Sequence, residues 1–144
     1  MIVTGKSVVE WMVSRGEEFS ARDAEGIGWH DGKRLVAGVA YTDYNGANLC
    51  MHVVAVPGKR WLTREFLWTC FDYPFNQCKV KRVTGLVGEG NLQARRFDEH
   101  LGFELETTLR GAHPTGDLIV YVMWKRNCRF LGEKYGQKER AACA

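Results

Sequence analysis

The chain has 144 residues, of which 45% are hydrophobic and 26% charged, as expected for one globular domain with a packed core. No apolar run approaches the ~20 residues that a membrane-spanning helix needs, and the first residues lack the pattern of a secretory signal. The formal net charge of +3 is smaller than the basic footprint usual in nucleic-acid-binding domains. We therefore expect neither a membrane nor a nucleic acid as partner.

The first half of the chain predicts one helix followed by an antiparallel meander. Apolar residues recur at helical spacing from Val8 to Val13 and predict a helix over residues 5–16. Two strong hairpin signals follow, Asp31-Gly32 and Asn45-Gly46. They separate three predicted strands over residues 27–30, 35–41 and 48–56.

After the turn at Pro57-Gly58 the apolar period changes from two residues to about 3.6. One helix face is predicted from Leu62 to Phe71, and Pro74 ends or kinks this helix. A second helix begins at Asn91, a good N-cap, and stops at Gly102. The remaining strands are predicted over residues 81–87, 104–110 and 118–125.

This order of elements predicts an α+β fold with three layers, in which a mixed, mostly antiparallel sheet carries helices on both faces. We expect a single domain over residues 1–128. Residues 129–144 are polar and basic, and they predict a partly disordered C-terminal tail.

The five cysteines predict free thiols. Their number is odd and none has Cys-x-x-Cys spacing, so neither a disulfide framework nor a zinc site is expected, and no metal is predicted. Free thiols are typical of a reducing compartment, which favours the cytoplasm.

A basic turn follows the third strand of the meander. Lys59 and Arg60 come just before the predicted helix, where unpaired backbone N–H groups and the helix dipole attract anions. The turn therefore predicts a phosphate-binding site, and a solvated basic turn is the alternative. Core and rim packing is the favoured interpretation of Trp29, Trp61, Trp68 and Trp124, and Trp61 is the one best placed to stack on a bound nucleotide instead.

The order of elements, and the pattern Asn91, Ala94, Phe97, Leu101-Gly102-Phe103, resemble the GNAT N-acetyltransferase superfamily. The resemblance implies an acyl-CoA donor, usually acetyl-CoA, and direct attack by a primary amine of unknown identity. It implies a splayed strand whose backbone pairs with the pantetheine arm, a loop that holds the pyrophosphate, and Asn91 beside the ligand. The implied cofactor-binding residues are Val54, Ala55, Val56, Gly58, Lys59, Arg60, Trp61, Leu62, Thr63 and Asn91. Because members of the superfamily are often dimers, a homodimer is compatible with the resemblance.

Two positions differ from the family's pattern. The phosphate loop has no second glycine after Gly58, and Asp98 stands where many members carry a tyrosine that protonates the leaving thiolate. An ionised aspartate is a poor acid. Both differences favour the alternative, a non-catalytic acyl-CoA-binding or protein-interaction member of the same fold.

His52 is the first candidate for a general base, because a histidine titrates near neutrality and lies just before the implied pantetheine strand. The competing candidates are Tyr41, Asp43 and Glu89. Arg95, Arg96 and the basic residues from Lys134 to Arg140 are interpreted as a solvated face. The alternatives are a nucleic-acid-binding module that uses the basic tail and aromatic residues and, for Arg95 or Arg96, a contact to the nucleotide end of CoA.

Overall fold

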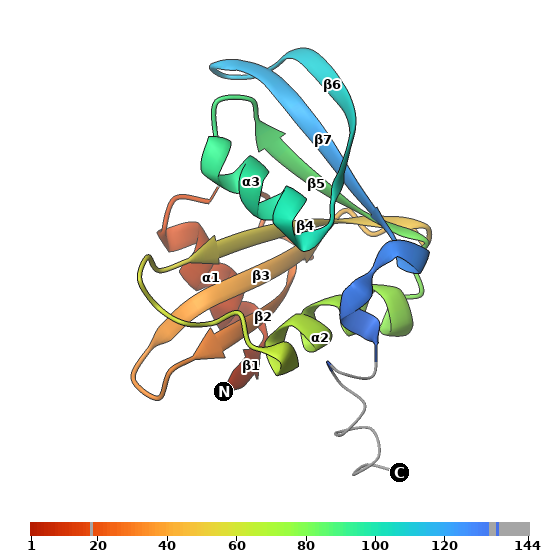
Figure 1. Cartoon of the computed structure of the whole chain (residues 1–144). Coiled ribbons are helices and arrows are strands. Elements are labelled where there is room, and N and C mark those ends of the chain that lie inside the picture. Colours follow the sequence, from red (N-terminus) through yellow and green to blue (C-terminus); the bar gives the residue numbers. More distant parts are fainter. Residues whose placement is uncertain (18, 133–134, 136–144) are drawn as a thin grey trace.

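The computed structural model describes residues 1–17, 19–132 and 135. This part of the chain forms a seven-stranded sheet with the order β1-β2-β3-β4-β5-β7-β6 (Figure 1). The strands are β1 (Ile2–Thr4), β2 (Glu25–His30), β3 (Leu35–Thr42), β4 (Asn48–Ala55), β5 (Arg82–Gly88), β6 (Glu104–His113) and β7 (Gly116–Trp124). The helical elements are α1 (Lys6–Ser14), α2 (Arg64–Asp72), α3 (Leu92–Leu101), a π-helical turn η1 (Tyr73–Gln77) and the 3-10 turns η2 (Lys125–Asn127) and η3 (Arg129–Leu131).

Every strand pair is antiparallel except β4–β5, which is parallel. Helix α1 covers one face of the sheet, whereas α2 and α3 lie on the other (Figure 1). The α+β class and the helices on both faces are therefore confirmed. Sequence reasoning missed β1, because three residues at the start of the chain are too short for a recognisable pattern.

Alternation along β4 assigns its side chains to the two faces. Val53 and Ala55 pack against the main core beneath α2 and α3, while Val54 packs against the smaller cluster beneath α1. His52 shares the α1 face with Val54, since side chains two apart on a strand point the same way.

Helix α2 begins later than predicted. Thr63 is its N-cap, and its Oγ1 accepts a hydrogen bond from the Phe66 backbone N–H at 3.1 Å, so Leu62 lies in the preceding loop. The expectation that Lys59 and Arg60 sit at the helix start was wrong, because the loop continues through residues 56–63 before the helix begins. Beyond α2 the chain widens into the π-helical turn at Pro74, which is the predicted kink.

The parallel ladder between β4 and β5 is short. It joins Asn48–Cys50 to Arg82–Thr84 and ends there, although β4 continues to Ala55 and β5 to Gly88. The facing edges of the two strands beyond this point are not paired with each other. The splay that the family resemblance implied is therefore confirmed.

A polar network pins the closed end of this ladder. The Asn48 Oδ1 atom accepts from Thr84 Oγ1 at 2.6 Å and from Arg82 Nε at 3.3 Å. Arg82 also forms an ion pair with Glu106 of β6 at 2.7 Å. These bonds tie β4, β5 and β6 together on the side opposite to the opening.

Core packing extends beyond the boundary predicted at residue 128. The Phe130 ring is buried and stacks on Phe71 with centroids 4.9 Å apart. The rest of the predicted tail, residues 133–134 and 136–144, lies outside the described residues.

Two further findings concern the described residues alone. None of their helices is both long and apolar enough to cross a membrane. Cys50, Cys70, Cys78 and Cys128 are free thiols, and no group of three or more potential metal ligands is found there.

Helix α1 packs closely on the sheet because the strands beneath it carry glycines. A Cβ on Gly38 would lie 2.8 Å from Met12 Cγ and 3.1 Å from Val8 Cγ1, both on α1. Gly26 and Gly28 of β2 are similarly close to Val8.

We expect Gly38→Ala to lower the free energy of unfolding by about 1–3 kcal/mol, because the new methyl group must displace Met12 or the helix. The measurement is the midpoint of urea denaturation. Gly90→Ala is the matched control, because a Cβ there would meet nothing within 4 Å. The control should change the free energy by less than about 0.5 kcal/mol, and an unchanged midpoint for Gly38→Ala would contradict the close packing.

Candidate active site

The diverging edges of β4 and β5 open onto a cavity of about 880 Å³. This volume lies within the ~300–1,000 Å³ usual for small-molecule sites. Of the residues predicted from the sequence, the cavity is lined by His52, Val54, Ala55, Val56, Gly58, Lys59, Trp61, Leu62 and Asn91. Arg60 and Thr63 do not line it. The structure therefore brings nine of eleven predicted residues to one place.

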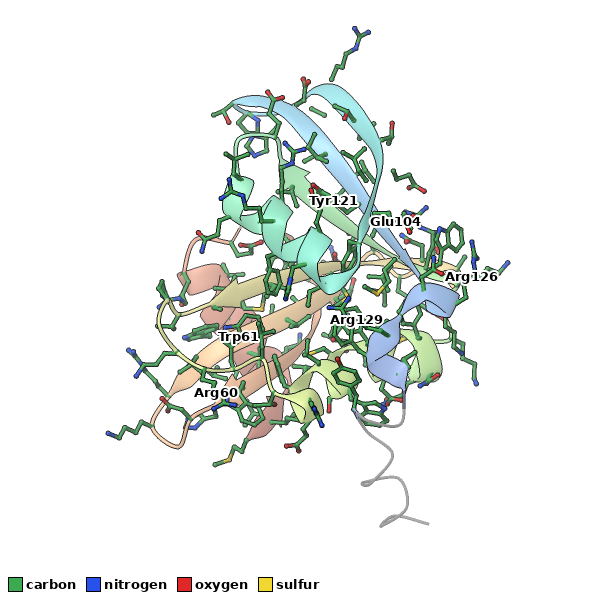
Figure 2. The ribbon with its side chains drawn as sticks, in the orientation of Figure 1. Arg60, Trp61, Glu104, Tyr121, Arg126 and Arg129 are labelled. Carbon is green, nitrogen blue, oxygen red and sulfur yellow. The ribbon has the colours of Figure 1, made fainter. Side chains whose placement is uncertain are left out.

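The loop between β4 and α2 forms one wall of the cavity. Gly58 has a φ of 76°, which only glycine adopts without strain, and it turns the chain directly after Pro57. Lys59 lines the cavity and Arg60 does not, so only one of these two neighbouring cationic residues borders the cavity. Both Arg60 and Trp61 are labelled on this loop in Figure 2.

Aromatic packing fixes the wall between the loop and α3. The Trp61 ring lies 5.7 Å from the ring of Phe97 on α3 and 6.0 Å from the ring of Phe66 on α2. Trp61 and Phe97 both line the cavity. The indole thus joins the loop to both helices and faces the space where a ligand would lie.

Asn91 caps α3 as predicted. Its Oδ1 accepts from the Ala94 backbone N–H at 3.2 Å. Asn91, Gln93 and Ala94 line the cavity, so the N-terminal turn of α3 borders it.

Asp98 lies two turns along α3 from the cap and faces the cavity. Its carboxylate Oδ2 would be 3.1 Å from a Cβ on Gly85, so the carboxyl group rests directly on the backbone of β5. Burial disfavours the charged form, and Glu99 adds repulsion, so that the pKa of Asp98 rises to about 7. At this pKa a substantial fraction of the carboxyl group is protonated around neutral pH and can donate its proton.

His52 lies on the α1 face of β4, on the opposite side of the sheet from Asp98. Its Nε2 is 2.9 Å from Thr42 Oγ1 on β3, and its ring stacks on Phe19 with centroids 4.7 Å apart. Burial lowers the pKa of His52, while the nearby Asp43 carboxylate partly opposes that shift. The imidazole is therefore held in its neutral, basic form at neutral pH.

The competing candidates for the base do not line the cavity. Tyr41 is buried and donates to the Cys70 carbonyl at 2.6 Å, and burial raises its pKa well above the ordinary value. Asp43 and Glu89 are exposed outside the cavity lining. Among these residues the geometry favours His52.

Arg95 and Arg96 also lie outside the cavity lining. Arg95 donates from Nε to the Tyr121 hydroxyl at 3.2 Å, and Tyr121 donates to Glu99 at 2.6 Å. Figure 2 labels Tyr121 on β7. Arg95 thus ties α3 to the sheet, which is a structural interaction within the domain.

Sequence reasoning missed His113, which the β6–β7 hairpin brings over β5. A Cβ on Gly88 would lie 2.7 Å from His113 Nε2, and both residues line the cavity. The Thr115 backbone N–H donates to Nδ1 at 3.3 Å, so the neutral ring carries its proton on Nε2. No local pattern signals this contact, because the two residues are 25 positions apart in sequence.

No family model matches this chain, and no curated protein matches it. Solved structures do. A chimeric spermidine N-acetyltransferase SpeG from Vibrio cholerae has a TM-score of 0.70 at 13% identity, over 92% of this chain and 98% of that one. SpeG from Vibrio cholerae in complex with CoA and spermine has a TM-score of 0.64 at 14% identity, over 88% of this chain and 76% of that one.

A GNAT-family acetyltransferase from Bacillus anthracis has a TM-score of 0.58 at 16% identity, over 75% of this chain and 76% of that one. At identities this low, the matches show similarity of fold only. The element order, the splayed strands and these matches agree, and the chain therefore has the GNAT N-acetyltransferase fold.

Proposed function

We propose that this protein is an acyl-CoA-dependent N-acetyltransferase that moves the acetyl group of acetyl-CoA to a primary amine. The observation that carries the proposal is the cavity at the split between β4 and β5. It combines strand edges that are not paired with each other, a candidate base on one face of the sheet and a candidate acid on the other. Similarity to a fold whose solved members include a CoA complex supports the choice of donor.

Acetyl-CoA would lie between the loop and α3. In this arrangement the pantetheine arm pairs with the backbone of Val54, Ala55 and Val56, whose edge toward β5 carries no strand. The diphosphate lies at Gly58 and Lys59, where a turn and a cation border the cavity. Arg60 and Thr63 are left out of the proposed site because they do not line the cavity.

In the proposed reaction the base and the acid act from opposite faces of the sheet. A neutral amine attacks the thioester carbon, the C–N bond forms and the C–S bond breaks. A backbone N–H of the β4 edge polarises the carbonyl. The amine's proton passes to His52, and the coenzyme A thiolate takes a proton from Asp98, so the products are the amide and the free thiol.

Asp98 replaces the family's tyrosine in this proposal. The sequence alone favoured an ionised, inactive aspartate, whereas burial against Gly85 raises its pKa to about 7. The difference from the family pattern therefore no longer argues against catalysis. No metal is needed for any step, and a reducing cytoplasm, predicted from the free thiols, suits a thiol product.

Calorimetry and a thiol-release assay test the proposal together. We expect acetyl-CoA to bind in isothermal titration and to raise the melting temperature, and thiol release to depend on an added primary amine. A panel of mono-, di- and polyamines and amino-acid amines identifies the acceptor. Binding without amine-dependent thiol release would favour the non-catalytic alternative, and no binding would reject both.

Lys59→Ala should weaken CoA binding by about three- to tenfold, because one exposed charge on a diphosphate contributes on the order of 1 kcal/mol. Arg60→Ala is the matched control and should leave the Kd of CoA nearly unchanged, because Arg60 does not line the cavity. Isothermal titration with CoA and with pantetheine, which lacks the diphosphate, separates the contributions. Equal weakening of both ligands by Lys59→Ala would contradict a phosphate contact.

Asp98→Asn should lower kcat, because an amide has the shape of the acid but no proton to give. Asp98 donates only while protonated, so the wild-type advantage should be largest below pH 7 and disappear by about pH 8–9. The ratio of wild-type to variant kcat, measured from pH 6 to 9 with one amine, cancels the amine's own ionisation. A ratio independent of pH would argue against Asp98 as the proton donor.

A further inference from the structure

We propose that Thr42 and Asp43 are positioning residues that hold His52 as its Nε2–H tautomer and thereby leave Nδ1 as the basic nitrogen. The role in catalysis rests on the proposed function, whereas the hydrogen-bond arrangement can be tested on the free protein.

The three side chains form a chain of hydrogen bonds across β3 and β4. His52 Nε2 lies 2.9 Å from Thr42 Oγ1, and Thr42 Oγ1 lies 2.9 Å from Asp43 Oδ2. Thr42 is only 8% exposed, so its hydroxyl has little access to water. Asp43 has a φ of 57°, an uncommon backbone conformation for a residue other than glycine.

Proton counting determines the direction of both bonds. A threonine hydroxyl has one proton to donate, and a carboxylate can only accept. The Thr42 hydroxyl donates to Asp43 Oδ2 at the exposed end of this chain of bonds, so the Thr42 proton belongs to that bond. Thr42 Oγ1 must then accept from His52, and the neutral ring therefore carries its proton on Nε2.

Phe19 also restrains the imidazole ring of His52. It stacks on the imidazole with an interplanar angle of 20°, so rotation of His52 would break both the stack and the bond to Thr42. The imidazole is thus held in one orientation, as a general base requires.

Burial and a nearby charge act in opposite directions on the protonation of His52. Burial is the largest influence and favours the neutral ring, while Asp43 favours the imidazolium. The other charged or titratable groups that line the cavity are Arg15, Glu17, Lys59, Asp98 and His113. The Asp43 charge thus restores part of the basicity that burial removes, although Asp43 does not line the cavity.

In the reaction the attacking amine nitrogen forms the C–N bond and releases one proton. That proton passes to Nδ1, directly or through one water, and the Nε2–H bond to Thr42 is kept. The resulting imidazolium is stabilised by the Asp43 carboxylate. Deprotonation to solvent restores the neutral tautomer.

Kinetic measurements on Thr42 variants test the proposed role of Thr42 in catalysis. Thr42→Val should lower kcat about tenfold, which corresponds to one lost hydrogen bond, and leave the Kd of acetyl-CoA unchanged. Thr42→Ser keeps the hydroxyl and should recover most of the activity. Thr108→Val, an exposed threonine on β6 away from the cavity, is the matched control.

A double-mutant cycle excludes a purely structural effect. In a His52→Asn background Thr42→Val should have no further effect on kcat, because the residue acts through His52. The same tenfold loss in that background, or full activity of Thr42→Val, would overturn the positioning role.

Nuclear magnetic resonance of ¹⁵N-labelled histidine tests the arrangement without substrate. In the wild type the neutral His52 ring should carry its proton on Nε2, and its titration midpoint should lie below the ordinary histidine value. Asp43→Asn should shift that midpoint to still lower pH, since the supporting charge is lost. A proton on Nδ1, or a midpoint unmoved by Asp43→Asn, would overturn the proposal even if acetyl transfer is observed. If the protein fails to bind acetyl-CoA while these spectra are as expected, the proposed function fails and the hydrogen-bond arrangement stands.

Discussion

The site depends on where the parallel pairing between β4 and β5 ends. The two strands pair only where Asn48–Cys50 lies beside Arg82–Thr84, and beyond these residues they separate. Asn48, Arg82 and Thr84 share hydrogen bonds at the closed end, and Glu106 extends them to β6 by an ion pair. Beyond this point the two strands bond outward to β3 and β7 instead of to each other. Backbone groups on a strand edge without a partner strand need another hydrogen-bonding partner, so the opening is suited to a ligand with its own amide groups.

The two faces of the split sheet carry groups whose ionisation is shifted by the same cause. Burial disfavours charge, so it lowers the pKa of His52 and raises that of Asp98 to about 7. The shifts have opposite sign because one group is charged when protonated and the other when deprotonated. Around neutral pH the site therefore favours a neutral imidazole and keeps a substantial fraction of a neutral carboxylic acid. A base and an acid can coexist in this way without neutralising each other.

Two glycines of β5 allow side chains from other elements to lie directly against this strand. Asp98 rests on Gly85, and His113 rests on Gly88, so two side chains distant in sequence reach β5 directly. A larger residue at Gly88 would push the β6–β7 hairpin away from the cavity. Helix α1 similarly packs on Gly38 of β3, which stabilises the half of the sheet that carries His52.

The sequence by itself determined most of the elements and much of the site. Hairpin turns at Asp31-Gly32 and Asn45-Gly46 and the cap at Asn91 are local signals, because turn and cap conformations depend on a few adjacent residues. The splayed strand and eight of the cavity-lining residues followed from the family resemblance, and His52 followed from the chemistry that a general base requires.

Only the tertiary structure decided which side chains face the cavity and in which ionisation state. It separated Lys59 from Arg60, placed the start of α2 after Thr63, and brought His113 to Gly88. It also reversed the interpretation of Asp98, since the pKa of a carboxyl group depends on the solvent and charges that surround it in space. These properties arise from contacts between residues far apart in the chain, which local patterns do not encode.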